Sequence, residues 1–211
     1  EVGFKADPSR SLQINGAAYL YDYTDQQVLS AVYGANGPVG LFVNVPASRI
    51  YGAELEGVWR PMPNLRISQS LSYKHGEYTD FFDLDVPASR TAGAAVYVDK
   101  SGRDIPFPAV SYGGAAAYDW NVEGFDLTAE ANYSYRDDYP SWLGVRYDVP
   151  AYWLANASLT VSPAVGRWSV TGFVRNLFDQ EYDLTRNFFT SADIAQPGRP
   201  RTYGIRLGYQ Y

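Results

Sequence analysis

Cysteine and histidine, two side-chain types that often carry out catalysis or bind metals, are almost absent from this protein. The 211 residues include no cysteine and a single histidine, His75. Thiol nucleophiles, Cys-ligated zinc and multi-histidine metal sites are therefore excluded. Ser141 and Ser191 have no histidine partner that the sequence identifies, and Gly-x-Ser-x-Gly, phosphate-loop and dinucleotide motifs are missing. We expect no catalytic residues, no metal site and no cofactor.

Aromatic rings and arginines remain as candidates for binding. A ring can stack on a flat ligand, and a guanidinium group can attract an anion. The alternative is that the same side chains anchor loops to one another or lie at a membrane boundary. The candidates all fall between the strands predicted below, and they are Tyr97, Tyr139, Trp142, Arg146, Tyr147, Arg186, Phe188 and Phe189.

Charge and hydropathy narrow the class of protein. Lys and Arg number 17 against 23 Asp and Glu, and the basic residues form no run, which argues against a nucleic-acid partner. The chain is 16% aromatic, yet its mean hydropathy is only −0.29. Such a composition indicates apolar residues that are spread by alternation. Since no stretch of about 18 apolar residues occurs, no transmembrane helix is predicted.

Strict alternation identifies the elements that must position the candidates. In Phe125–Arg136 all six odd positions are apolar or aromatic and all six even positions are polar, the period of a β-strand. Residues 65–74 follow the same pattern with Gln69 as its one exception, and residues 202–211 repeat it. No helical periodicity is convincing, so we predict an all-β chain. Weaker alternation occurs at 12–24, 49–60, 110–118, 152–161 and 168–176.

Strand length and loop length together predict a membrane barrel. Most of these segments exceed the roughly 5–6 residues of a globular strand and match the roughly 9–11 of a transmembrane strand. The connections alternate between short and long, as in an antiparallel transmembrane β-barrel with short periplasmic turns and long extracellular loops. A soluble sandwich has no reason to sort its loops in this way. The short connections are 6–10, 61–64, 119–124 and 162–167, and the long ones are 25–48, 79–108, 138–150 and 180–201.

The long segment 79–108 contains five aspartates without the spacing of a calcium loop. They predict a solvated loop and are Asp80, Asp83, Asp85, Asp99 and Asp104.

Short motifs recur along the chain in a definite order. They are Gly3-Phe4-Lys5, Tyr21-Asp22-Tyr23 with Asp25-Gln26-Gln27, Gly52-Ala53-Glu54-Leu55-Glu56 with Arg60-Pro61, Asn176-Leu177-Phe178-Asp179 with Tyr182, and Pro200-Arg201. In this order and spacing they resemble the C-terminal half of TonB-dependent outer-membrane receptors, over essentially all 211 residues. The last strand also resembles the signal recognised in barrel assembly, although Tyr stands where many members end in Phe. The residues that fit this signal are Thr202, Gly204, Leu207, Tyr209 and Tyr211.

The resemblance implies how the chain is organised. Residues 1–211 would be the C-terminal part of the receptor β-barrel, about nine strands where plugged transporters have 22. The N-terminal plug domain, the TonB box and the first strands would be absent from this chain. With one face against lipid, the other would line the lumen, either as a hydrated wall that holds the plug or as a guide for substrate. The expected lumen residues are Glu54, Glu56, Arg66, Lys74, Asp126, Glu130, Arg136, Arg175 and Arg206.

The resemblance also implies a function and its partners. The barrel would lie in bacterial outer-membrane lipid, be inserted by the barrel assembly machinery, and import a scarce small-molecule nutrient with energy from the TonB complex, acting through the plug. A ferric siderophore is the leading candidate for that ligand. Uptake of cobalamin, a haem or a glycan, a passive porin-like barrel and a soluble carbohydrate-binding domain remain as alternatives.

Overall fold

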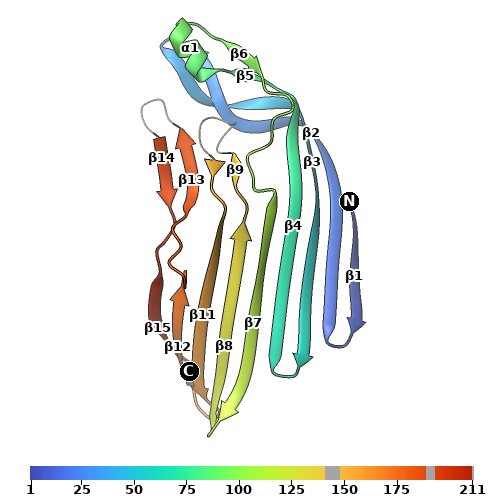
Figure 1. Ribbon diagram of the computed structural model, residues 1–211, viewed down its shortest axis with the longest axis vertical. Helices are drawn as coiled ribbons and strands as arrows, with labels where there is room; N and C mark the ends of the chain where they lie inside the picture. The colour runs from blue at the N-terminus through green and yellow to red at the C-terminus, as the bar shows by residue number, and fades with distance from the viewer. Residues whose placement is uncertain (141–147, 189–192, 211) are drawn as a thin grey trace.

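Nine strands form one antiparallel sheet in which neighbours in sequence are neighbours in space. The computed structural model describes residues 1–140, 148–188 and 193–210. The prediction of an all-β, partial barrel of about nine strands is confirmed, with β1 and β15 as the two edges of the sheet (Figure 1). The strands are β1 (Val2–Ser9), β2 (Leu12–Gly34), β3 (Gly37–Met62), β4 (Leu65–Asp80), β7 (Val110–Val122), β8 (Phe125–Arg136), β11 (Tyr152–Pro163), β12 (Trp168–Arg175) and β15 (Thr202–Tyr209).

The four connections predicted to be short lie at one end of the sheet, and the four predicted to be long lie at the other end. Figure 1 shows the turns of the β1–β2, β3–β4, β7–β8 and β11–β12 hairpins at the lower end and the other connections at the upper end. The β7–β8 turn uses Glu123 and Gly124 at φ 51° and 86°, the positive values that a two-residue hairpin turn requires. The upper connections contain β5 (Phe82–Leu84), α1 (Val86–Ala92), β6 (Tyr97–Asp99), β9 (Tyr139–Pro140), β10 (Asp148–Val149), β13 (Asp183–Phe188) and β14 (Asp193–Pro197).

The prediction that residues 25–48 form a loop is wrong. β2 and β3 stay paired to the tip of their hairpin, where Gly34 lies opposite Gly37. The ladder is interrupted once, between the Thr24–Ala47 and Gln26–Val45 pairs, where Asp25 has φ 55° and Pro46 has no N–H to donate. Both residues are turn signals in a sequence, and for that reason the sequence alone predicts that the strands end there. In Figure 1 the hairpin bends over at the upper end of the sheet.

Segment 79–108 is also more ordered than a solvated loop. It contains α1, a helix that the alternation does not predict. The Asp85 carboxylate accepts a hydrogen bond from the Ala88 N–H at the start of α1, and Gly93 ends the helix at φ 65°. The segment packs on the bent β2–β3 hairpin around Val45, Tyr78, Phe81 and Ile105. We call residues 26–45 and 78–108 together the loop-side unit.

A buried ion pair lies within segment 78–108, and a hydrogen bond from Ser30 ties it to the bent β2–β3 hairpin. Lys100 Nζ lies 2.5 Å from Asp83 Oδ2, and the two side chains are 8% and 3% exposed. The Ser30 hydroxyl donates a 2.5 Å hydrogen bond to Asp83 Oδ1. Burial and the charge of Asp83 raise the pKa of nearby Tyr78 to about 12. The expectation of five solvated aspartates is therefore wrong for Asp83, since a buried carboxylate persists only with such partners.

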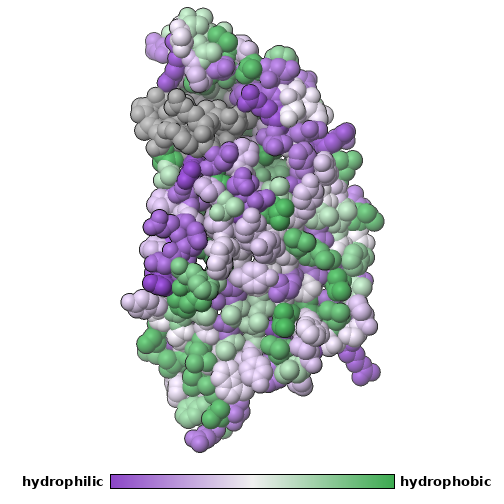
Figure 2. Space-filling view, in the orientation of Figure 1, coloured by the Kyte–Doolittle hydropathy of each residue, from purple (hydrophilic) through white to green (hydrophobic). Residues whose placement is uncertain are grey.

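Within the described residues, no helix has the length and apolar character to cross a membrane. Figure 2 shows hydrophobic residues over the strands and a concentration of hydrophilic ones near the upper connections.

Candidate functional site

The register of the sheet places all nine expected lumen residues on one face. Arg66, for example, lies opposite Ala117, and Ala117 lies opposite Glu130. Hydrogen bonds between neighbouring strands join polar side chains across this face, such as Asn156 to Asn132 at 2.7 Å and Thr160 to Thr171 at 2.9 Å. We call this polar surface the inner face. The expected lumen residues on it are Glu54, Glu56, Arg66, Lys74, Asp126, Glu130, Arg136, Arg175 and Arg206.

The opposite, outer face is apolar in the middle and aromatic at both ends of the strands. Ala129 and Ala131 occupy the middle of β8. The polar exception, Gln69, accepts a 2.5 Å hydrogen bond from the Tyr133 hydroxyl, so its amide oxygen is satisfied without water. Rings at the lower end are Trp59, Tyr118, Trp120, Phe125 and Trp168, and those at the upper end are Tyr51, Tyr73, Tyr112, Tyr133, Tyr135 and Trp153. Such girdles lie at the level of lipid headgroups.

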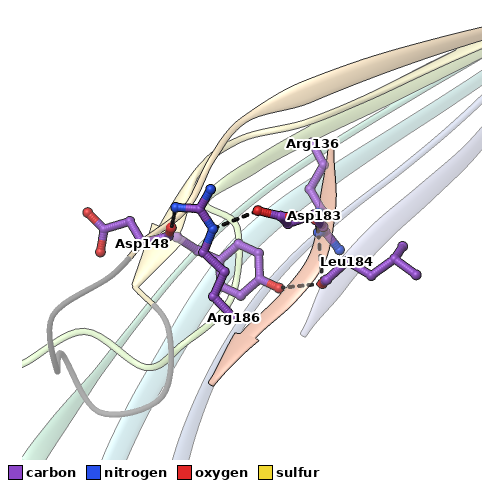
Figure 3. A network of polar contacts seen from close by, with 6 residues as sticks. Arg136, Asp148, Asp183, Leu184 and Arg186 are labelled. Carbon is purple, nitrogen blue, oxygen red and sulfur yellow. Dashed lines mark hydrogen bonds and ion pairs between the residues drawn. The ribbon is translucent and has the colours of Figure 1, made fainter. Parts of the chain in front are cut away.

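The upper end of the inner face carries a compact cluster around Arg136. The guanidinium carbon lies 5.0 Å from the ring centre of Tyr139 and 4.7 Å from that of Tyr152. The Arg136 Nη2 group donates hydrogen bonds to the backbone carbonyls of Asp183 and Leu184 on β13, at 3.5 and 3.3 Å. Figure 3 shows the Arg136 side chain directed at the β13 backbone. Two loop connections and two sheet strands therefore meet at one arginine.

The two arginines of the Arg136 cluster differ in their partners. Arg186 forms a 2.7 Å ion pair with Asp183 and also donates to the Asp148 carbonyl at 3.3 Å (Figure 3). Arg136 has rings and carbonyls as partners, and among the described residues no carboxylate pairs with it. Its buried Nε also lacks a hydrogen-bond partner there. Within the described part of the chain, the cluster thus presents a positive charge that no ion pair neutralises, flanked by two aromatic rings.

The loop candidates from the sequence do not all gather at this cluster. Tyr139 and Arg186 belong to it, since the Tyr139 hydroxyl also donates to the Leu184 carbonyl at 3.4 Å. Tyr97 lies on β6 in the loop-side unit and is exposed. Phe188 is the last residue of β13, and its backbone pairs with that of Asp193 on β14. Outside the described residues lie Trp142, Arg146, Tyr147 and Phe189.

Tyr152 is a member of the cluster that sequence reasoning missed. It lies at the start of β11, opposite Arg136 on β8, and its ring contacts Tyr182 at 4.5 Å between centroids. Tyr182 follows the Asn-Leu-Phe-Asp motif, so the cluster is connected to that motif. The sequence does hold a signal for it, because Tyr152 is an aromatic residue on the polar face at the end of an alternating segment.

The Asn-Leu-Phe-Asp motif forms a turn that ties β12 to the entry of β15. The Asn176 amide oxygen accepts from Gln180 N–H, and its amide group donates to the Gln180 and Arg199 carbonyls. Asp179 accepts from the Arg201 N–H at 2.8 Å. Asn176 and Asp179 both have positive φ, at 51° and 54°, which Asn and Asp adopt more readily than most residues.

The assembly-signal residues lie on the edge strand β15. Thr202 and Gly204 belong to the inner face, where a side chain at Gly204 would collide with the Phe173 ring. Leu207 and Tyr209 point to the outer face and are strongly exposed. Tyr211 lies outside the described residues.

Comparisons with known proteins agree with this architecture. A family model described as TonB dependent receptor-like, beta-barrel, matches residues 1–177. No curated protein sequence matches the chain.

Several solved structures share the fold. The ferric yersiniabactin uptake receptor FyuA from Yersinia pestis is similar with a TM-score of 0.78 and 18% identity, over 99% of this chain and 29% of that one. The copper transporter OprC has a TM-score of 0.68 and 17% identity, over 99% and 31%. BauA, the ferric preacinetobactin receptor from Acinetobacter baumannii, has a TM-score of 0.66 and 19% identity, over 98% and 28%. The chain therefore spans about three tenths of the length of these proteins.

Proposed function

Since this chain belongs to the TonB-dependent receptor β-barrel family, we propose that it forms part of an outer-membrane receptor for an anionic ferric siderophore. Members of the family are outer-membrane proteins of Gram-negative bacteria, and the family is one of receptors and transporters, not of enzymes. Several structures with the same fold are named as receptors for iron-bearing ligands. They are less than 20% identical to this chain, so the ligand proposed for this chain is argued from its own residues.

The Arg136 cluster is the observation that carries this proposal. Its guanidinium group lacks a carboxylate partner among the described residues and lies between the rings of Tyr139 and Tyr152. An anionic chelate with aromatic arms would place negative oxygens near Arg136 and flat groups against the rings. The cluster lies at the loop end of the inner face, where a ligand entering from outside the cell would arrive first.

The remaining partners follow from the same proposal. The polar inner face would hold the N-terminal plug through hydrogen bonds and ion pairs, and the TonB complex would act on that plug. A barrel wide enough for a siderophore would leak without a plug, and the outer membrane has no energy source of its own. The exposed β15 edge would be the part that the barrel assembly machinery recognises and that closes against the first strand.

Replacing Arg136 by Gln in the intact receptor should weaken binding of an anionic ferric chelate by about tenfold or more, because a charge-assisted hydrogen bond is lost. Ferric tris-catecholate and ferric citrate are suitable anionic probes, and a neutral ferric trishydroxamate is the matched uncharged one. Their dissociation constants would be measured by titration of the detergent-solubilised receptor at low and high salt. Binding of the anionic probes to the native protein should weaken with salt, because the attraction is screened.

Arg66→Gln is the control for this experiment. Arg66 lies on the same inner face at the turn end of β4 and is exposed, so the substitution removes the same charge far from the cluster. Its effect on the anionic probes should be small. Equal affinities for native protein and Arg136→Gln would contradict the proposed site. Growth on a glycan or cobalamin that depends on the receptor, with unchanged uptake of every ferric chelate, would move the function to those ligands.

A further inference from the structure

A ladder of three tyrosines lies on the inner face, away from the Arg136 cluster. Tyr19, Tyr21 and Tyr23 occupy alternate positions of β2 and share the face of Glu54. The ring centroids of Tyr19 and Tyr21 are 5.1 Å apart, and those of Tyr21 and Tyr23 are 5.9 Å apart. Alternate residues of a strand are about 6.8 Å apart, so the rings lean together. They form a nearly continuous aromatic surface along the strand.

The neighbouring strand leaves this surface open. Opposite Tyr19 stands Gly52, where a Cβ atom would come within 2.7 Å of the Tyr19 ring carbon Cζ. A glycine is therefore required for the Tyr19 ring to lie across β3. The three rings, with Ile50 and Glu54, line a shallow hollow of about 340 Å³. Tyr21 and Tyr23 are 38% and 43% exposed.

The charge of this hollow is opposite to that of the Arg136 cluster. Glu54 lies in it, Glu1 accepts a 3.2 Å hydrogen bond from the Tyr21 hydroxyl, and among the described residues no Lys or Arg lines it. Aromatic faces and carboxylates both attract cations and hydrogen-bond donors. A carboxylate or other anion would meet repulsion here and find no basic partner.

We propose that the Tyr19–Tyr21–Tyr23 ladder is a binding subsite for a ring-bearing ligand group that is cationic or rich in hydrogen-bond donors. The ring would stack on the tyrosines, and its amine or hydroxyl groups would face Glu54. This subsite is distinct from the one proposed at Arg136, because its three rings and Glu54 stand on β2 and β3 and it takes a group of the opposite charge.

A matched pair of small phenols tests the charge and the stacking separately. Tyramine is a cationic phenol, and 4-hydroxyphenylacetate carries a carboxylate on a similar ring. Saturation-transfer NMR on the intact receptor in detergent should detect tyramine binding, with a much smaller signal from 4-hydroxyphenylacetate. Tyr21→Leu should weaken tyramine binding by about fivefold, the loss of one exposed cation–π contact. Glu54→Gln should reduce the preference for tyramine over the anionic phenol.

Two further variants separate binding from folding. Replacing all three tyrosines by Phe keeps the rings and should retain most of the tyramine signal. Tyr112→Leu removes a tyrosine from the outer face, where it stacks on Tyr135 at 4.7 Å, and should leave the signal unchanged. Arg136→Gln should also leave tyramine binding unchanged, so failure at one subsite is distinguishable from failure at the other.

Three outcomes would overturn the subsite. One is the absence of tyramine binding to the intact receptor, which would mean that another part of the protein, such as the plug, covers the ladder. The second is binding of 4-hydroxyphenylacetate as strong as that of tyramine. The third is an equal loss of signal in Tyr21→Leu and Tyr112→Leu, which would place the bound phenol elsewhere.

Discussion

Arginine in place of Ala129 should destabilise the folded barrel by roughly 2–4 kcal/mol, the cost of a basic side chain on the lipid face near the bilayer midplane. Ala129 lies in the middle of β8 on the outer face, between Tyr118 of β7 and Leu159 of β11. The neighbouring strands thus offer the guanidinium group an aromatic ring and an aliphatic chain. The free energy of unfolding would be measured by urea titration of the intact receptor in lipid vesicles.

Thr128→Arg is the matched control, one residue away on the inner face. The Thr128 hydroxyl donates a 2.6 Å hydrogen bond to the Asp119 carboxylate, so an arginine there meets a carboxylate and water in place of lipid. We expect this variant to fold with nearly the stability of the native protein. Equal stability of the two arginine variants would refute the assignment of the faces.

Lys100→Met should destabilise the loop-side unit by about 3–5 kcal/mol, because it leaves the Asp83 carboxylate buried without its partner. The Ser30 hydroxyl would be the only remaining polar contact that the structure shows for that carboxylate. Lys100, Asp83 and Ser30 all lie within the loop-side unit, so the loss should be local. Hydrogen exchange of the amides in α1 and β6, in the intact receptor, would measure the opening free energy of the unit.

The double variant Lys100→Met with Asp83→Asn provides the control for this prediction. It removes both charges, and the Asn oxygen can still accept from Ser30. Replacing a buried ion pair by neutral groups is often neutral or stabilising, whereas removing one partner is costly. The double variant should therefore recover much of the lost protection. Unchanged exchange rates in Lys100→Met would show that the pair is not buried in solution.

The two ring clusters on the inner face suggest how one receptor can hold a chelate with groups of both signs. The Arg136 cluster offers a cation between two rings, and the tyrosine ladder offers rings beside Glu54. We expect a bound ligand to direct its anionic part toward β8 and β11. Its cationic or hydroxyl-rich part would lie toward β2 and β3.

The alternation of polar and apolar residues determined the architecture from sequence alone. A strand that separates lipid from water must alternate at every second residue, so Phe125–Arg136 could be assigned to two faces without a structure. Because short and long connections alternate along the sequence, it could also be predicted which ends of the strands lie together. The inner-face position of Arg136 followed from the same parity, as did that of Glu54.

Local capping signals would have predicted more than alternation did. Asp85 before the helix, Pro87 in its first turn and Gly93 after it mark the start and end of α1. The helix is only seven residues long, too short for a periodic apolar stripe, so a search for periodicity passes over it. The β2–β3 extension was hidden for a related reason, because Asp25 and Pro46 look like loop residues when each is read alone.

Which side chains meet was decided only by the tertiary structure, because these contacts join residues far apart in the chain. Arg136 gains its environment from Tyr152 of the next strand and from the β13 backbone. Asp83 is buried because Lys100 and Ser30 reach it from two other segments. The Tyr19 ring has room because Gly52 stands opposite it in the register of β2 and β3. Alternation assigns a residue to one face of the sheet. Its neighbours on that face depend on strand register and loop packing, and those neighbours determine its chemistry.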